Sequence, residues 1–330
     1  MKKLLLLFLA GIAAAAGFAV AMLSPVDTKQ ARPVFFNVSP GESLHKVSAD
    51  LHQLGLIRNP KLFVAMGKVR GVASDLKAGP YRARTDEWAW TILDRMVHGD
   101  VRDTTVTIRE GLWITEVSEV LGPFVAGGAD SLLSVAQSGD LAASRGLDSL
   151  EGYLFPSTYR IVPGIEPRLV LEQMVDTFEE IWEKDLQARA EALGRTKEEV
   201  VTLASIVEAE AQVGSERPRI AAVYLNRLAK GMKLQADPTV LYGLGERKTR
   251  TLYADLESSS PYNTYRFEGL PPGPIGNPGL ASLKAALWPD PDCEDLFFVA
   301  RGDGSHLFGK TFKDHKENRR RVRREREARP

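Results

Sequence analysis

Two glutamates, Glu208 and Glu210, lie within an otherwise apolar run at residues 203–210. A carboxyl group buried among apolar side chains has its charged form destabilised, so its pKa rises and it can act as a general acid near neutral pH. On a helix the two side chains flank the buried face on opposite sides, and spacing alone does not choose between them. Residues two apart do not face each other, so the pair cannot straddle a glycosidic bond as acid and nucleophile. The alternative is that both are exposed glutamates of a surface helix.

A capping sequence predicts where the helix that carries these glutamates begins. Thr196 is followed three residues later by Glu199, which is the spacing of a capping box, and apolar residues then recur on one helical face. Ser205 stands one helical turn before Glu208, where a hydrogen bond between the two side chains is feasible.

Further elements are predicted on both sides of this helix. Residues 237–279 are rich in Pro, Gly, Asn and Tyr and too long for a simple connection, and long loops in compact domains are commonly functional. The periodicity and the turn residues predict helices over 167–194, 219–230 and 281–287, and short strands over 296–300 and 306–308.

Composition excludes several other kinds of chemistry. The chain has one cysteine, Cys293, which cannot form an internal disulfide or a cysteine-based metal site. Its five histidines show no metal-binding spacing, so the sequence predicts neither a metal nor another cofactor. The 43 Lys and Arg residues balance 43 Asp and Glu residues, so no basic field favours binding of nucleic acid.

One formal motif points to a nucleotide site. Residues 304–311 match the phosphate-binding loop, with Lys310 and Thr311 at its end. A true phosphate-binding loop joins a strand to a helix, and its fold needs further strands, one of which ends in a magnesium-binding Asp. Fewer than twenty residues follow Thr311. We interpret the match as a coincidence, and phosphate binding by Lys310 is kept as an alternative function.

The N-terminus carries a membrane signal. Lys2 and Lys3 precede an unbroken apolar run that begins at Leu4 and ends at Leu23. Such a run is long enough to cross a bilayer, and the lysines would keep its start in the cytoplasm. The alternative is a cleaved signal peptide, because residues 19–21 read Ala-Val-Ala, a possible processing site. Both interpretations place the remaining chain outside the cytoplasm.

A strand, a glycine turn and an amphipathic helix occur twice at one offset. The matching pairs are Val38 and Ile108, Gly41 and Gly111, Val47 and Val117, Ser48 and Ser118, and Leu51 and Leu121. The first copy resembles the LysM glycan-binding signature, and the second is a weaker version of it. The alternative is that any strand, glycine turn and helix gives this pattern.

Eight motifs in order resemble the YceG-like family of membrane-anchored endolytic murein transglycosylases. One of them, LASIVEAE at 203–210, contains Glu208, and a longer one, AVYLNRLAKGMKLQADPTVLYG at 222–243, follows it. The others are EGYLFP at 151–156, ERP at 216–218, YNTY at 262–265, GLPPGP at 269–274, NPG at 277–279 and FVARGDGSH at 298–306. The resemblance spans the exported part of the chain and is strongest from Glu151 to His306.

This resemblance implies a catalytic role for Glu208, on which the essential glutamate of the family falls. Ala209 and Ala211 stand where the family usually has Lys and Thr, which puts the contacts of Glu210 in question but leaves Glu208 in place. The implied reaction cleaves the β-1,4 bond between N-acetylmuramic acid and N-acetylglucosamine without water. Glu208 protonates the leaving oxygen and then takes the proton of the muramyl C6 hydroxyl, which closes a 1,6-anhydro ring.

A single acid that becomes the base suffices for this reaction, so uncharged side chains are expected to position the substrate. The candidates for this role, which lie in loops, are Gln235, Tyr262, Asn263 and Tyr265. The alternative is that these four residues only shape the loop.

The sequence and the resemblance together predict an α+β protein with a mainly helical, lysozyme-related catalytic domain. The predicted order is a transmembrane anchor (1–23), a tether (24–33), a LysM-like domain (34–102), a second LysM-like unit (103–149), the catalytic domain (150–315) and a charged tail (316–330). The expected location is the inner or plasma membrane, with the catalytic domain on the periplasmic or extracellular side. The expected partners are peptidoglycan glycan strands and a cell-wall synthase beside which strand elongation is terminated. The alternative is a non-catalytic scaffold that binds peptidoglycan.

Overall fold

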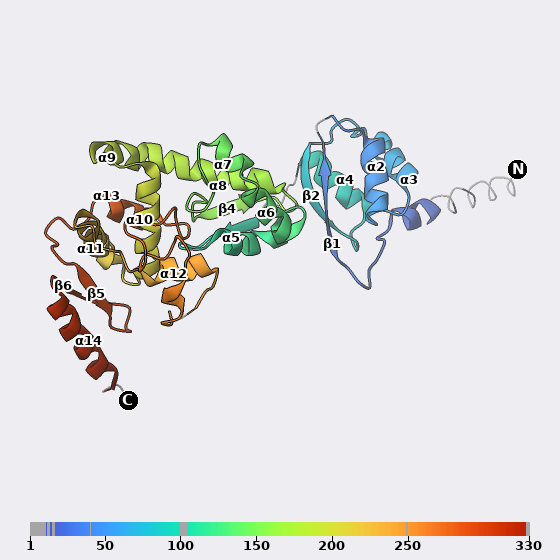
Figure 1. The fold of residues 1–330 in the computed structure, drawn as a ribbon. Coiled ribbons are helices and arrows are strands. Elements are labelled where there is room, and N and C mark those ends of the chain that lie inside the picture. The colour runs from blue at the N-terminus through green and yellow to red at the C-terminus, as the bar shows by residue number, and fades with distance from the viewer. Residues whose placement is uncertain are drawn as a thin grey trace, which may run out of the picture. The chain divides into compact units, whose positions relative to one another are not determined.

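The computed structural model describes residues 11, 14, 17–39, 41–99, 104–248 and 250–327. These residues form helices and three two-stranded sheets, β1–β2, β3–β4 and β5–β6 (Figure 1), so the predicted α+β class is confirmed. The chain divides into two compact units. The N-terminal unit comprises Met1–Val106, Pro123–Gly128 and Arg160–Glu166, and the C-terminal unit comprises Thr107–Gly122, Ala129–Tyr159 and Pro167–Pro330.

The N-terminal unit encloses its own apolar core. β1 and β2 pair antiparallel, with Phe36 opposite Tyr81. Ser43 caps α2 and Asn59 caps α3 through their side-chain oxygens. The elements follow in the order β1 (Pro33–Val38), α2 (Leu44–Gln53), α3 (Pro60–Val69), β2 (Gly79–Arg84) and α4 (Ala89–His98). Their fully buried side chains include Leu51, Phe63, Tyr81, Ile92, Leu93 and Met96.

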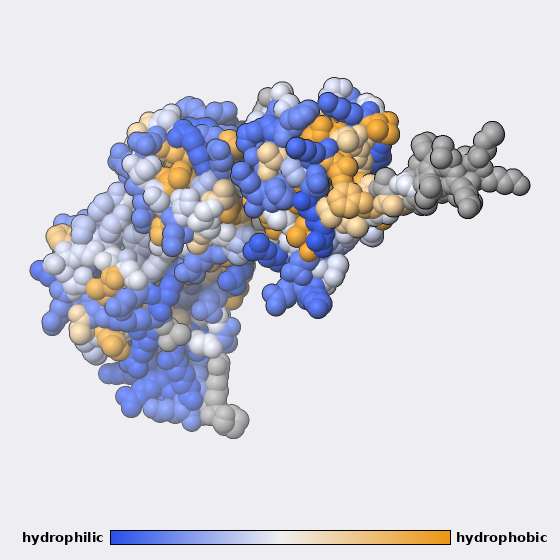
Figure 2. Space-filling model, turned by 90° about the vertical axis from the view of Figure 1, so that its right-hand side faces the viewer, coloured by the Kyte–Doolittle hydropathy of each residue, from blue (hydrophilic) through white to orange (hydrophobic). Residues whose placement is uncertain are grey.

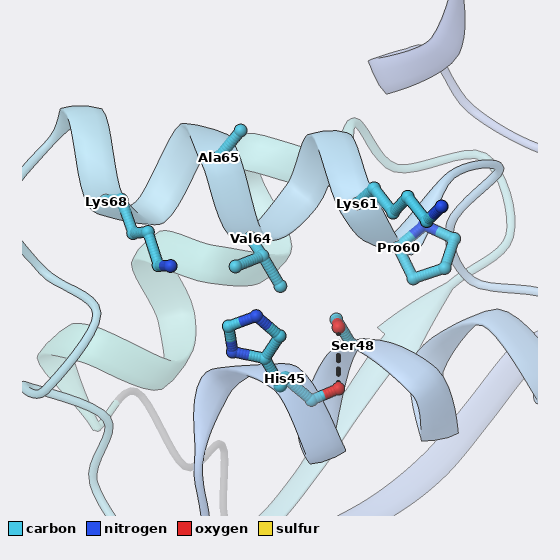
Figure 3. Close-up of a pocket in the computed structure, with 7 residues that line it drawn as sticks. All are labelled: His45, Ser48, Pro60, Lys61, Val64, Ala65 and Lys68. Carbon is cyan, nitrogen blue, oxygen red and sulfur yellow. Dashed lines mark hydrogen bonds between the residues drawn. The ribbon is translucent and has the colours of Figure 1, made fainter.

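A groove of about 360 Å³ lies between α2 and α3 (Figure 3). Val64 and Ala65 give it an apolar wall on α3, and His45 lies opposite them on α2. Lys61 and Lys68 also line the groove, and neither forms an ion pair or side-chain hydrogen bond with another described residue. The groove therefore combines an apolar wall with two unneutralised cations.

The predicted membrane anchor lies mostly outside the described residues. Of the run from Leu4 to Leu23, the structure describes residues 11, 14 and 17–23, which are helical. Within the described part of the chain, no helix has both the length and the apolar character needed to cross a membrane.

The two predicted strand–turn–helix segments are both present. The second consists of β3 (Thr104–Thr107), a turn and α5 (Ile114–Leu121). Gly41 and Gly111 occupy the same place in the two turns, with φ of 77° and 76°, a region that favours glycine. The repeated helical positions are buried in both copies, as Val47, Ser48 and Leu51 in α2 and Val117, Ser118 and Leu121 in α5.

The remaining elements are mostly helices. They are α6 (Gly128–Gln137), α7 (Asp140–Ser144), β4 (Thr158–Ile161), α8 (Pro167–Ile181), α9 (Gln187–Ala192), α10 (Lys197–Glu210), α11 (Arg217–Ala229), α12 (Asp237–Leu244), α13 (Leu280–Leu287), β5 (Phe297–Ala300), β6 (His306–Gly309) and α14 (Phe312–Glu327). Short 3₁₀ turns cover Gly122–Phe124, Gly214–Glu216 and Asp255–Glu257.

Helix α10 is the central helix of the C-terminal unit. The predicted capping box is confirmed, because Thr196 accepts from the Glu199 backbone and Glu199 accepts from the Thr196 backbone. Every residue from Val200 to Val207 is buried, and α10 packs against α11 and α13 (Figure 1). The carboxyl end of α10, where Glu208 lies, is therefore held on a rigid support.

The predicted helix over 167–194 differs from expectation at one point. A π-helical turn, Trp182–Leu186, separates α8 from α9. Trp182 and Leu186 are both buried, and Trp182 stacks on Phe178 with ring centroids 6.2 Å apart. A π turn shifts the helical register, and this one leaves both apolar side chains in the core.

The segment that matches the phosphate-binding loop contains the second strand of a β-hairpin. β5 and β6 pair antiparallel, and β6 contains four of the residues that would have to wrap a phosphate. Lys310 instead pairs with Glu294 at 2.7 Å. After Thr311 the chain enters α14, so the described part of the predicted charged tail is helical and buries only Val322. The structure gives no support to the nucleotide alternative.

The surface is predominantly hydrophilic on the face shown in Figure 2, where apolar residues form small separate patches. Such scattered apolar side chains are usual on protein surfaces.

Candidate active site

The carboxyl group of Glu208 is fixed by two hydrogen-bond donors. Arg217 Nη2 donates to Oε1 at 2.8 Å, and the Gly279 backbone N–H donates to Oε2 at 3.0 Å. The Glu208 side chain is only 6% exposed. Both oxygens are thus engaged, and the carboxyl is held in one orientation at the end of α10.

Arg217 joins three elements at this point. It is the first residue of α11, and its Nε donates to Ser282 Oγ of α13 at 3.0 Å. Its Nη2 also lies 3.8 Å from Oε2 of a second carboxylate, Glu110. One guanidinium group is therefore shared by two carboxylates.

Glu110 comes from the turn between β3 and α5, and its side chain is 49% exposed. Partial burial raises its pKa, the charge of Glu208 raises it further, and Arg217 opposes both effects. Its carboxyl fills the space beside Gly279, because a Cβ on Gly279 would lie 1.9 Å from Glu110 Oε1. Only glycine can therefore occupy position 279 without displacing a neighbour.

Glu210 lies in surroundings different from those of Glu208. Its Oε1 accepts a hydrogen bond from the Tyr224 hydroxyl at 2.9 Å. Burial raises its pKa to about 7, and the charge of Asp237 adds to this effect. Among the described residues Glu210 shares no hydrogen-bond partner with Glu208. Glu208 therefore has the two fixed donors, and Glu210 belongs to a separate cluster.

Asn277 ties the segment before α13 to the turn that carries Glu110. Its backbone O accepts from Gly111 N at 2.8 Å, and its backbone N donates to Leu112 O at 2.9 Å. Its side chain accepts from Leu154 N at 2.8 Å and donates to Glu151 at 3.1 Å. This network sets the position of the Gly279 N–H two residues later.

Glu151 is a buried residue that forms hydrogen bonds with Asn277 and with the start of α5. It is 4% exposed, and it accepts from Ile114 N at 3.1 Å and from the Tyr242 hydroxyl at 3.2 Å. Burial raises its pKa to about 7, although these hydrogen bonds oppose the shift. Glu151 is therefore a buried carboxyl that changes charge near neutral pH.

We expect Glu151 to make stability depend on pH. A carboxyl whose pKa is higher in the folded state binds more protons there, so its contribution is largest below its unfolded pKa and is lost as pH rises through 7. The free energy of unfolding of residues 24–330 should therefore fall between pH 5 and pH 8. Deprotonation of Glu151 should account for up to about 3 kcal/mol of this fall. In urea titrations the Glu151→Gln protein should lose less free energy of unfolding over the same pH range, because glutamine does not titrate. Parallel pH curves for the two proteins would contradict this.

Of the four predicted substrate-positioning residues, Asn263 and Gln235 take opposite roles. Asn263 is fully buried, and its amide donates to Leu256 O at 2.9 Å and to Ser258 O at 2.8 Å, so it shapes the loop. Gln235 is exposed and has φ of 51°, a strained value for a residue other than glycine. Such strain occurs preferentially at functional positions.

The two tyrosines lie in separate clusters. The Tyr262 ring is 4.9 Å from the Tyr242 ring, and the Tyr265 hydroxyl donates to Asp237. Within the described part of the chain, neither tyrosine forms a hydrogen bond with Glu208. The structure therefore does not bring the four predicted residues together with Glu208 through direct contacts.

The suggested hydrogen bond between Ser205 and Glu208 is wrong. Ser205 Oγ donates to the Thr202 carbonyl at 2.8 Å, as helical serines often do, and accepts from Ile275 N at 3.0 Å. Conversely, no sequence pattern had pointed to a role for Glu110, Arg217 or Gly279. Arg217 lies in the motif ERP and Gly279 in the motif NPG, and membership in these motifs was the one sequence feature that could have identified them as site residues.

No ligand set for a metal is found near Glu208 or elsewhere in the described ranges. There, no three His, Cys, Asp or Glu side chains come together in a way that could hold a metal ion. The chemistry available to Glu208 is proton transfer by a carboxyl with fixed geometry.

Comparison with known proteins identifies the family. The profile of the YceG-like family matches residues 36–321, which include every residue of the site. The chain belongs to the YceG-like family. Its relatives include the endolytic murein transglycosylase of Bacillus subtilis (strain 168), which is 33% identical over 314 residues that cover 89% of this chain and 86% of the relative.

Two further relatives agree with this assignment. The endolytic murein transglycosylase of Streptococcus pneumoniae (serotype 2, strain D39) is 26% identical over 90% of this chain, which spans 59% of that protein. The crystal structure of a yceG-like protein from Listeria monocytogenes matches with a TM-score of 0.60 and 31% identity. That match covers 87% of this chain and 99% of the other. The fold and the motifs of the site thus belong to one family.

Proposed function

We propose that this chain is an endolytic murein transglycosylase whose catalytic acid and base is Glu208. The observation that carries the proposal is the fixed carboxyl of Glu208, which has two oriented donors, in a chain 33% identical to an endolytic murein transglycosylase. A reaction with an intramolecular nucleophile needs one such carboxyl, because the group that donates the first proton can accept the second.

The reaction proceeds in two proton transfers. Protonated Glu208 donates to the glycosidic oxygen as the bond between muramyl C1 and that oxygen breaks, which releases the 4-hydroxyl of N-acetylglucosamine. The Glu208 carboxylate then takes the proton of the muramyl C6 hydroxyl as its oxygen bonds to C1. The products are one chain end with a free 4-hydroxyl and one with a 1,6-anhydro ring, and water is not consumed.

Arg217 and the Gly279 N–H stabilise the carboxylate that forms after the first transfer. Both are donors, at 2.8 Å and 3.0 Å, so their interaction with Glu208 strengthens as negative charge develops on it. Because they are fixed before the reaction, no rearrangement is needed at that moment. Gln235, Tyr262 and Tyr265 are proposed to contact the glycan, and Asn263 to hold the loop that carries the tyrosines.

Product analysis tests the reaction class. Residues 24–330 are incubated with uncrosslinked glycan strands, and the products are separated by length and examined by mass spectrometry. An endolytic enzyme gives internal fragments of intermediate length from the first minutes. Release of only terminal disaccharides would mean an exolytic enzyme, and absence of cleavage with binding retained would favour the scaffold.

The N-terminal unit is proposed to be a LysM-like module that binds the glycan strand in the groove between α2 and α3. Its strand–helix–helix–strand order with antiparallel strands and the signature at residues 38–48 support this. Lys61 and Lys68 give the groove cations that suit the carboxylates of peptide stems on the glycan (Figure 3). The anchor from Leu4 to Leu23 would hold the enzyme at the plasma membrane, where new strands emerge beside a cell-wall synthase.

Charge reversal in this groove should weaken binding to the wall. With Glu208→Gln in all proteins to prevent cleavage, Lys61→Glu combined with Lys68→Glu should lower the affinity for purified peptidoglycan about tenfold, since two attractive charges become repulsive. Sedimentation with peptidoglycan measures this effect. Lys29→Glu, an exposed lysine outside the groove, is the control. Equal affinity of all three proteins would place the wall-binding surface elsewhere.

A further inference from the structure

The C-terminal helix α14 concentrates positive charge in a chain that is neutral as a whole. It lies beside β5 and β6 in the C-terminal unit (Figure 1). It holds eight Lys and Arg side chains and four Asp and Glu side chains, which gives it a net charge of +4. Because the chain has equal numbers of acidic and basic residues, everything outside α14 together carries a net charge of −4.

One face of α14 is held against the hairpin of β5 and β6. Val322 is buried on this face, and Asn318 Nδ2 donates to the Phe308 carbonyl at 3.0 Å. The centroid of the His315 ring lies 5.3 Å from that of the Phe297 ring. These contacts fix the orientation of the helix, so its opposite face points outward.

The outward face carries four exposed cations, which we call the basic stripe: Lys313, Lys316, Arg320 and Arg324. At 3.6 residues per turn they lie within about 80° of one another, on the side of the helix opposite Val322. None of the four forms an ion pair or side-chain hydrogen bond with another described residue. Glu317 is the one acid within the stripe that is not bound to an arginine, because Glu327 pairs with Arg323 at 2.9 Å. The stripe is therefore largely unneutralised.

The spacing of these cations is unfavourable for a helix in water. Lys316, Arg320 and Arg324 follow one another at intervals of four residues, and like charges at this spacing destabilise a helix. A partner with dense negative charge would remove this repulsion.

The shape of the stripe and the sequence together indicate which partner this is. The stripe is the outer side of a helix and is therefore convex, so it suits a flat surface better than a single strand, which a groove would enclose. The apolar run from Leu4 to Leu23 is long enough to cross a bilayer and would keep a membrane surface within reach. Clusters of four or more Lys and Arg residues on such a tethered chain are typical of binding to anionic lipids.

We propose that the basic stripe of α14 binds the surface of a bilayer rich in anionic phospholipids. The inference rests on the proposed membrane location of the chain. The attraction is between the cations and the phosphate-bearing headgroups, so it weakens at high salt. The contact holds the unit that carries Glu208 at the membrane by a second point besides the anchor, and strands would be cut close to the bilayer.

Sedimentation with lipid vesicles tests the inference. Residues 24–330 lack the apolar run and keep both apolar cores, so their binding reports contacts other than the anchor. The wild type should bind vesicles of phosphatidylcholine and phosphatidylglycerol in equal parts and should not bind pure phosphatidylcholine. Arg320→Gln combined with Arg324→Gln should lower the affinity about thirtyfold, because each cation at an anionic bilayer strengthens binding about fivefold. Lys230→Gln combined with Arg250→Gln, a control that removes the same charge from exposed positions outside α14, should change it little.

The outcomes separate this inference from the proposed function. Equal binding of the wild type to both kinds of vesicle, or unchanged affinity of the α14 variant, would overturn the inference. An equal loss in the control variant would also overturn it, because net charge and not the stripe would then govern binding. If the α14 variant keeps its affinity for vesicles and loses affinity for purified peptidoglycan, the partner is the wall and the inference is wrong. The vesicles contain no glycan, so failure of the proposed function would appear separately, as full cleavage by Glu208→Gln.

Discussion

Glu208→Gln is expected to lower kcat by about three orders of magnitude, because both proton transfers depend on one carboxyl. Glutamine has nearly the same shape and still accepts from the Gly279 N–H, so the fold and the binding of glycan should be retained. The measurement is the initial rate of strand cleavage, with thermal unfolding and peptidoglycan sedimentation as checks on the same protein.

Glu210→Gln is the matched control for this prediction. It removes the same charge from the same turn of α10, and Glu210 faces Tyr224 instead of the cluster around Glu208. We expect it to keep most of the activity. If Glu210→Gln were inactive and Glu208→Gln active, the assignment of the acid would have to be reversed.

Gly279→Ala is expected to lower kcat about tenfold, less than the hundredfold loss that a displacement of about 1 Å at a reacting group can produce. The new Cβ would lie 1.9 Å from Glu110 Oε1 and 2.2 Å from its Cδ, so either Glu110 or the backbone of residue 279 must move. Because the Glu110 side chain is half-exposed and flexible, it should take up most of this displacement, and a smaller shift of the backbone weakens the contact of the Gly279 N–H with Glu208. Steady-state rates at the pH optimum measure the effect.

A second substitution distinguishes this cause from general damage to the fold. Glu110→Ala removes the atoms that the new Cβ would strike, so the double variant Gly279→Ala with Glu110→Ala should recover a large part of the activity lost in Gly279→Ala. Additive losses in the two single variants and the double variant would show that the two positions do not act on each other.

Local sequence patterns correctly predicted the helix that carries Glu208 and the two glycine turns. The capping box at Thr196 and the apolar periodicity that follows fix where α10 begins and which face it buries, because both depend on residues a few positions apart. The two turns at Gly41 and Gly111 were likewise predictable, since glycine, strand and helix signals lie close together in the chain.

The contacts around Glu208 were not predictable in this way. Glu110 and Gly279 come from segments far apart in the sequence, and their meeting with Arg217 depends on how α10, α11 and α13 pack. Ser205 shows that closeness in sequence does not guarantee a contact. It is near Glu208 in sequence, but its side chain forms hydrogen bonds within its own helix and with Ile275. Spacing along a helix predicts a face, and only the packed structure shows what that face meets.

Digestion in water enriched in oxygen-18 shows whether Glu208 cleaves the glycan strand without water. Mass spectrometry of the new chain ends from wild type and Glu208→Gln is the measurement. We expect unlabelled internal fragments that end in 1,6-anhydromuramic acid from the wild type and no cleavage by the variant. Reducing ends that carry the heavy oxygen would show that the enzyme is a hydrolase, and anhydro ends from Glu208→Gln at the wild-type rate would show that another group is the acid.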